Sequence, residues 1–283
     1  MTDIRLDPHL DEILSVAARG RGRIVVLTGA GISAESGIPT FRGGDGFWTV
    51  GSRNYHPQEL ATHATFARRP EVVWPWYLHR LGVCLQAEPN AGHRALGDLE
   101  GGFGERFVVV TQNVDGMHLR AGNSEARTWQ IHGNIAWMRC DRPCHSGALP
   151  VPAALARPDR SATLEDDERA TLRCASCGGW MRPHVLWFDE SYDEENYRFH
   201  SSLRAADEAG LLIVVGTSGA TNLPIQMGRA VAARRGALVD VNPEHNPFAA
   251  LAERLDEGHF AQGTAAALLP AIVDRLLAAE KAR

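Results

Sequence analysis

Short, continuous hydrophobic runs recur along the chain and predict buried strands. Arg23–Thr28 and Phe107–Thr111 are two such runs, and residues 211–217 and 237–241 are two more, all rich in aliphatic residues. Strands of a parallel sheet covered on both faces are apolar throughout instead of alternating with polar residues. Because stretches with helical patterning separate the runs, we expect an α/β fold with a parallel sheet between two layers of helices.

Helical spacing of apolar residues marks both ends of the chain. Asp7 and Pro8 are typical of an N-cap and the first residue of a helix. Apolar residues follow at helical spacing, at Leu10, Ile13, Leu14 and Ala17. Near the C-terminus a last amphipathic helix is predicted by Leu269, Ile272, Val273, Leu276 and Leu277.

Two segments interrupt the alternation of strands and helices. Residues 43–95 are rich in aromatic residues, glycine and proline and contain a helical pattern near Glu71, whereas residues 133–190 contain four of the five cysteines. We expect both to form a smaller lobe, one as a helical insertion and the other as a cysteine-rich module. The sheet domain would then be discontinuous, built from residues 1–42, 96–132 and 191–283.

Composition narrows the classes of function. The chain has 283 residues, 44% hydrophobic and 22% charged, with a formal net charge of -5. This charge gives no overall attraction to nucleic acid or anionic membranes. The first residues lack the pattern of a signal peptide, and no apolar run approaches the roughly 20 residues of a membrane span. We therefore expect a cytoplasmic protein whose cysteines are reduced.

A glycine-rich stretch follows the first predicted strand. Gly29, Ala30 and Gly31 begin the sequence GAGISA, which matches the G-x-G-x-x-G/A pattern at a strand-to-helix turn. Such glycines let the backbone approach a pyrophosphate, which the helix N-terminus favours. No clear acidic residue follows about 20 residues later to read the ribose. We predict a Rossmann-like nucleotide loop that differs from the dehydrogenase type, with an ordinary glycine turn as the alternative.

Four cysteines form two closely spaced pairs. Cys140 and Cys144 are separated by three residues, and Cys174 and Cys177 by two, with about 30 residues between the pairs. This spacing is typical of zinc ribbons, in which four thiolates close a tetrahedral structural site. Unconnected buried thiols are the alternative. Cys84, on a predicted helix, is expected to belong to the core.

Polar residues follow the predicted strand that ends at Thr111. Gln112, Asn113 and Asp115 come directly after it, where ligands bind in open α/β sheets. His132 stands next to Gly133, which leaves backbone room around the imidazole. Taken singly, each has a structural explanation as well, such as a capped helix start or a hydrogen-bonded core histidine.

Five stretches follow one another along the chain together with the cysteine pairs: GAGISAESGIPTFRG (29–43), TQNVDGMHLRAG (111–122), QIHG (130–133), GTS (216–218) and VNPE (241–244). In this order they resemble the sirtuins, a family of NAD-dependent protein deacylases, over residues 23–270. The resemblance implies a Rossmann-like doubly wound sheet with a zinc-binding module, NAD as a consumed co-substrate, and acylated lysines of proteins as substrates.

The resemblance also implies roles for individual residues. The family's catalytic base matches His132. Its NAD-binding positions match Gly29, Ala30, Gly31, Phe41, Arg42, Gln112, Asn113, Asp115, Gly216, Thr217, Ser218, Asn242 and Ala265. In such enzymes nicotinamide leaves as the acyl oxygen attacks the ribose, and the histidine deprotonates a ribose hydroxyl. A histidine suits this step because its pKa lies near the working pH. The products are free lysine and O-acyl-ADP-ribose.

A second resemblance concerns the acyl group. Tyr77 and Arg80 match the Tyr-x-x-Arg of the sirtuin branch that removes malonyl and succinyl groups, and Thr40 in IPTFR also fits that branch. Residues three apart share a helix face, and an arginine can pair bidentately with a substrate carboxylate. We expect a preference for acidic acyl groups, with plain deacetylation as the alternative. Asp189 departs from the family, which usually has glycine at this position, and we expect it in the strand that pairs with the substrate backbone; residues 216–224 carry one extra residue next to that strand.

Three other classes of function remain alternatives. ADP-ribosyl transfer or NAD hydrolysis on the same fold is disfavoured by the presence of His132. A non-catalytic NAD-sensing module is disfavoured because Asn113 and Asp115 are also present. A nucleic-acid-binding zinc ribbon is disfavoured by the net charge and by the acidic residues 165–168 between the cysteine pairs. The oligomeric state is not determined by the sequence, and we favour a monomer.

Overall fold

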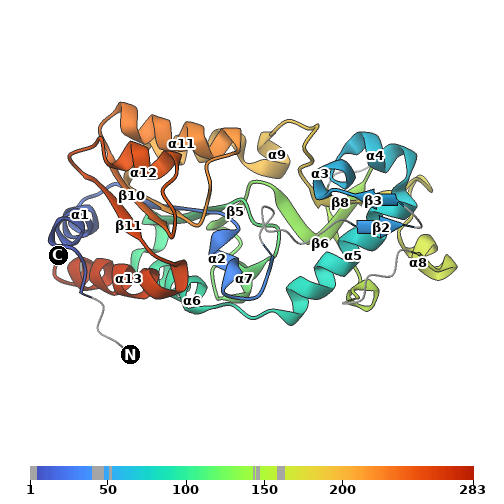
Figure 1. Ribbon diagram of the computed structural model, residues 1–283, viewed down its shortest axis with the longest axis horizontal. Coiled ribbons are helices and arrows are strands. Elements are labelled where there is room, and N and C mark those ends of the chain that lie inside the picture. Colours follow the sequence, from blue (N-terminus) through green and yellow to red (C-terminus); the bar gives the residue numbers. More distant parts are fainter. Residues whose placement is uncertain (1–4, 40–47, 51–52, 143, 145–146, 158–162) are drawn as a thin grey trace.

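A six-stranded parallel sheet forms the centre of the larger lobe in the computed structural model (Figure 1). The structure describes residues 5–39, 48–50, 53–142, 144, 147–157 and 163–283, without the side chains of 48–50, 53–55 and 57. The spatial order of the strands is β11-β10-β9-β1-β4-β5. Their bounds are Arg23–Thr28 for β1, Phe107–Thr111 for β4, Thr128–Gln130 for β5, Ala209–Val215 for β9, Ala237–Asn242 for β10 and Gly258–Gln262 for β11. This is the doubly wound Rossmann order, so the predicted fold class is confirmed.

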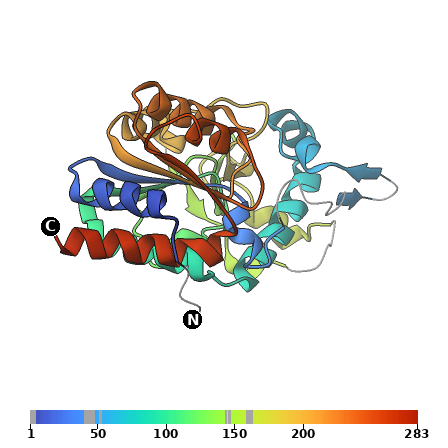
Figure 2. The ribbon, with the colours of Figure 1, turned by 60° about the vertical axis from the view of Figure 1, so that its left-hand side comes forward.

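Helices cover both faces of this sheet. Figure 2 shows α1 and α13 on the opposite side from α11 and α12. One face packs against α1 (Pro8–Arg19), α6 (Ala91–Phe103) and α13 (Ala265–Lys281), and the other against α10 (Phe199–Asp207), α11 (Asn222–Ala233) and α12 (Pro247–Ala252). Strand residues alternate between the two cores: Ile24 and Val26 face the first, and Val25 and Leu27 the second. This double burial explains why the strands are apolar throughout.

The smaller lobe has its own core, in which Phe66, Trp74 and Trp187 are fully buried. Its antiparallel sheet has the order β7-β6-β8, and a hairpin pairs β2 with β3. The strand bounds are Trp48–Val50 for β2, Arg53–Tyr55 for β3, Gly133–Cys140 for β6, Leu149–Pro150 for β7 and Met181–Val185 for β8. The helices are α3 (Pro57–Leu60), α4 (His63–Arg68), α5 (Pro70–Gln86), the short 3-10 helix η2 (Ala153–Leu155) and α8 (Asp166–Thr171).

Several short elements connect these parts. They are α2 (Gly31–Ala34), η1 (Gly104–Arg106), α7 (Met117–Arg120) and α9 (Glu194–Tyr197). The strand expected at residues 211–217 begins two residues earlier and ends at Val215, because Gly216 takes a left-handed conformation with φ 59°. Within the described ranges, no helix is long and apolar enough to cross a membrane.

Candidate functional site

Two glycine loops pack against each other at the carboxyl edge of the sheet, where β1 and β9 end. Gly31 N donates to the Gly216 carbonyl oxygen at 2.8 Å, and Gly29 N donates to that of Val215 at 2.9 Å. A Cβ atom at Gly31 would lie 2.7 Å from Gly216 Cα. The backbone contact between the two loops therefore requires glycine in the predicted nucleotide loop, whether or not a ligand also approaches it.

The segment after β4 is fixed to the glycine loop by its amide side chains. Gln112 Nε2 donates to the Thr28 carbonyl oxygen at 3.2 Å and to Thr217 Oγ1 at 2.9 Å. Asn113 Nδ2 donates to the Gly29 carbonyl oxygen and to Ser33 Oγ, both at 3.1 Å. The structure thus brings together three sequence-predicted stretches, the glycine loop, the segment after Thr111 and the segment after β9.

Asp115 lies at the same edge and is largely buried. Its carboxylate accepts hydrogen bonds from Met117 N at 2.9 Å and from Ser33 Oγ at 2.7 Å. Burial raises the pKa of Asp115, and these two hydrogen bonds oppose the rise. Ser33 in turn contacts His93 Nε2 at 3.3 Å. Neither Ser33 nor His93 was expected at the site from the sequence, because neither belongs to the polar segment after Thr111.

His132 follows β5 and has both ring nitrogens in hydrogen bonds. Nδ1 lies 3.0 Å from the backbone carbonyl oxygen of Gln112, and Nε2 lies 2.8 Å from the Tyr192 hydroxyl. A carbonyl oxygen can only accept, so Nδ1 carries the proton and Nε2 presents its lone pair. Burial lowers the pKa of His132 to about 4, opposed by the bond to Gln112. The imidazole is therefore neutral near pH 7, with its lone pair on Nε2, but its pKa lies well below the working pH that was expected of the base from the sequence.

Two further residues at this site had no signal in the sequence. Tyr192 lies in the loop before α9, and Thr221 is the residue before α11. Thr221 does not cap its helix; its hydroxyl donates to Gln112 Oε1 at 2.8 Å instead. The loop after β9, which contains the extra residue, is thereby joined to Gln112.

A further group of the predicted NAD-binding residues lies at the ends of β9 and β10 and at the start of α13. Thr217 and Asn242 are buried, whereas Ser218 is exposed. Asn242 Nδ2 donates to Asp240 Oδ1 at 2.7 Å. Ala265 is buried at the first turn of α13, next to Thr264, whose hydroxyl donates to Glu35 after α2. This side chain contact places the start of α13 beside the glycine loop.

Tyr77 and Arg80 come from α5 in the smaller lobe. The Tyr77 hydroxyl accepts a hydrogen bond from Trp187 Nε1 at 2.8 Å. The Arg80 guanidinium carbon lies 5.3 Å from the centre of the Trp76 ring. Burial lowers the pKa of Arg80, and the charges of Cys84, Tyr77 and Asp115 oppose this.

The four predicted metal ligands converge, which confirms the grouping read from the sequence. One sulfur from each of Cys140, Cys144, Cys174 and Cys177 lies within 4.8 Å of the others. Cys144 Sγ is 3.3 Å from that of Cys140 and 3.5 Å from that of Cys174, and Cys140 and Cys177 are 3.6 Å apart. Tetrahedral zinc with Zn–S bonds of about 2.3 Å needs sulfurs about 3.8 Å apart. The arrangement therefore fits a structural zinc ion, and Cys84 is separate and buried.

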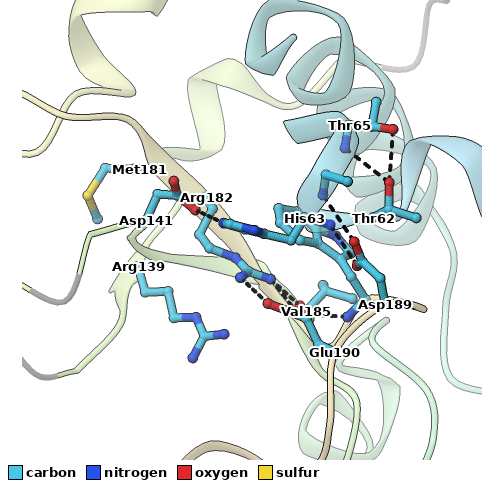
Figure 3. Close-up of polar contacts among 12 residues, drawn as sticks. Thr62, His63, Thr65, Arg139, Asp141, Met181, Arg182, Val185, Asp189 and Glu190 are labelled. Carbon is cyan, nitrogen blue, oxygen red and sulfur yellow. Dashed lines mark hydrogen bonds and ion pairs between the residues drawn. The ribbon is translucent and has the colours of Figure 1, made fainter. Parts of the chain in front are cut away.

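The segment after β8 is held by a network of ionic and backbone contacts (Figure 3). The buried Arg182 donates to both carboxylate oxygens of Glu190, at 2.8 Å for Oε2. Asp189 lies in a turn and accepts from the backbone N–H groups of His63 and Ala64, at 2.7 and 3.0 Å. Because β8 ends at Val185, Asp189 is not in a strand, contrary to expectation; its carboxylate caps α4 instead.

Phe41 and Arg42, predicted to bind NAD, and Thr40, predicted to mark the acyl branch, lie outside the described residues.

Comparisons with known proteins agree with the motifs. Residues 29–222, more than half of the chain, match the Sir2 family. An NAD-dependent protein deacylase of Leptospira interrogans is 34% identical over 255 residues, which cover 90% of this chain and 93% of that protein. One from Aquifex aeolicus is 40% identical over 235 residues, 81% of this chain and 87% of the relative.

Solved structures show the same similarity in three dimensions. The crystal structure of a Sir2 homologue in complex with NAD superposes with a TM-score of 0.78 at 33% identity, covering 98% of this chain and 96% of the other. A mutant Sir2 homologue in complex with 2'-O-acetyl ADP ribose gives a TM-score of 0.77 at 33% identity, covering 97% and 98%. With its Rossmann-like sheet, its cysteine quartet and these matches over most of its length, the chain belongs to the Sir2 family.

Proposed function

We propose that this chain is an NAD-dependent protein lysine deacylase. The observation that carries the proposal is the state of His132: its Nδ1–H is engaged by the Gln112 carbonyl, so Nε2 is a neutral base. This nitrogen lies at the carboxyl edge of the sheet, where open α/β folds bind nucleotides. The relatives named above as NAD-dependent protein deacylases support the same activity.

Nicotinamide would leave as the acyl oxygen of the substrate attacks the ribose. His132 Nε2 would accept the proton of a ribose hydroxyl, which then attacks the acyl carbon, and water would release free lysine and O-acyl-ADP-ribose. The NAD-binding roles assigned from the sequence remain part of this proposal: Gly29, Ala30, Gly31, Phe41, Arg42, Gln112, Asn113, Asp115, Gly216, Thr217, Ser218, Asn242 and Ala265. Those of these residues that the structure describes lie at one edge of the sheet, which supports their assigned roles.

We further propose that the enzyme prefers acidic acyl groups such as succinyl and malonyl. Arg80 would pair with the carboxylate of the acyl group. Tyr77 and Arg80 lie three residues apart on the same helix, α5, which supports this. Tyr77 accepts from Trp187 and therefore keeps its own proton, which it can donate to an acyl oxygen. Plain deacetylation is the alternative.

The zinc site would have a structural role. Four thiolate ligands leave no open coordination position for chemistry. The ion would hold the ends of β6 and β8 together in the smaller lobe.

The test is mass spectrometry of acetyl-, malonyl- and succinyl-lysine peptides incubated with the purified protein, with and without NAD. We expect NAD-dependent loss of the acyl group, fastest for the acidic acyl groups, and formation of O-acyl-ADP-ribose. His132→Ala should abolish the reaction while the protein remains folded. Faster loss of acetyl would refute the acyl preference alone. Consumption of NAD without deacylation would instead establish the hydrolase or ADP-ribosyltransferase alternative.

A further inference from the structure

The lone pair of His132 Nε2 accepts a hydrogen bond from a side chain of the protein itself. Because Nδ1 donates to the Gln112 carbonyl, the 2.8 Å contact between Nε2 and the Tyr192 hydroxyl has one possible direction. Tyr192 donates its proton and Nε2 accepts it. An imidazole nitrogen has one lone pair, so it cannot accept a second hydrogen bond in the same plane from a ribose hydroxyl.

Tyr192 is held in this position by its surroundings. Its ring stacks on Phe199 at 6.1 Å between centroids and lies 5.8 Å from the His132 ring, tilted by 32°.

The loop around Tyr192 is tied down on both sides. Glu190 is bound by Arg182, and Asp193 accepts from Asn196 N in the first turn of α9. Tyr192 itself is only half-buried and belongs to no helix or strand. A rotation of the side chain can thus free Nε2 without unfolding of the loop.

We propose that Tyr192 is a positioning residue that blocks the base until the dinucleotide binds. Without nucleotide its hydroxyl donates to Nε2 of His132, and the ribose hydroxyl displaces it when the dinucleotide binds. This inference rests on the proposed role of His132 as the base. Its consequence is that each binding event breaks one existing hydrogen bond, which weakens the apparent affinity for the nucleotide.

Tyr192→Phe tests the proposal because it removes the hydroxyl and keeps the ring that stacks on Phe199. Binding of ADP-ribose, measured by titration calorimetry, should tighten by about two- to tenfold, the range expected for one net hydrogen bond. The KM for NAD should fall in parallel, and kcat should not fall. Tyr197→Phe is the matched control, because Tyr197 lies in the same region but its hydroxyl accepts from Arg139 instead; it should leave the ADP-ribose affinity unchanged.

A double-mutant cycle separates this inference from the proposed function. If Tyr192 acts through His132, the gain from Tyr192→Phe disappears in the His132→Ala background. Retention of deacylation by His132→Ala would refute His132 as the base. If that variant is inactive, the inference is overturned by an unchanged ADP-ribose affinity in Tyr192→Phe. It is also overturned by a more than tenfold loss of kcat in that variant, which would make Tyr192 a proton relay.

Discussion

Ser33 Oγ donates a hydrogen bond of 2.7 Å to Asp115 Oδ2 and thereby joins the helix of the glycine loop to the segment after β4. Ser33 is buried, and its hydroxyl also accepts from Asn113 Nδ2. The Asn90 N–H donates to Nδ1 of His93, so Nε2 of that histidine carries the proton and donates to Ser33 as well. One hydroxyl therefore orients the side chains of Asn113 and Asp115, both of which we assign to NAD.

The first prediction concerns this hydroxyl. Ser33→Ala leaves Asp115 with one hydrogen-bond donor fewer in a buried position, which should destabilise the protein by about 1–3 kcal/mol. The pKa of Asp115 should rise further because a bond that favours the carboxylate is lost. We expect a several-fold higher KM for NAD, measured by steady-state kinetics beside urea unfolding.

Ser36→Ala is the matched control. Ser36 follows the same short helix, but its hydroxyl accepts from Asn90 and has no contact with Asp115. An equal rise in KM in both variants would mean that Ser33 acts through the general stability of the segment and not through Asp115.

The second prediction concerns the metal. Elemental analysis should find one zinc per chain, and Cys174→Ser should lose it together with the cooperative unfolding of the smaller lobe. Cys84→Ser is the control, because Cys84 is buried in the same core but lies outside the quartet. It should keep the metal. A stable, metal-free preparation of the unmodified protein would contradict the structural role of zinc.

The third prediction concerns Arg80. Arg80→Met should raise the KM for a succinyl-lysine peptide far more than that for an acetyl-lysine peptide, because only the former offers a carboxylate. Arg80→Lys keeps the charge but loses the planar fork, so it should recover part of the preference. Equal losses for both peptides in Arg80→Met would show that Arg80 supports the pocket wall and does not read the acyl group.

The fold and the ligands of the metal could be predicted because their signals are local in sequence. Apolar runs mark strands such as β1 and β4, and the cysteine pairs need only the right spacing within each pair. The division into lobes by residue number stays a prediction, as do the roles of the individual site residues.

Contacts between distant segments could not be predicted in this way. Tyr192 and His132 meet from two separate segments, and no spacing rule links a tyrosine in a loop to a histidine 60 residues earlier. Asp189 was expected in a strand, but its carboxylate satisfies the first N–H groups of α4, a partner more than 120 residues away. A helix start needs such acceptors, yet the sequence does not reveal which residue supplies them.

The last prediction concerns pH. Burial lowers the pKa of His93, His132 and His184 to about 4 and that of His118 to about 3, from an ordinary value of 6.5. Below pH 6.5 the unfolded chain therefore binds protons that the folded protein does not, and stability should decrease as the pH falls from about 6.5 towards 4. Each such group contributes up to about 1.4 kcal/mol per pH unit in this window. Asp240 acts in the opposite direction, because burial raises its pKa to about 6.

Comparing the stability of a histidine variant with that of the unmodified protein separates the effect of that histidine from the opposite effect of Asp240. His118 is fully enclosed and its Nε2 contacts only Thr28 Oγ1, at 2.9 Å, among the hydrogen bonds of the described residues. His118→Gln keeps a polar group near Thr28 but cannot titrate, so the decrease in stability between pH 6 and 5 should become smaller by up to about 1.4 kcal/mol. Urea unfolding at both pH values measures this, with the exposed His200→Gln as the control. If His118→Gln retains the full pH dependence of the unmodified protein, buried neutral His118 is not a source of the acid sensitivity, and the burial of its uncharged ring has to be reconsidered.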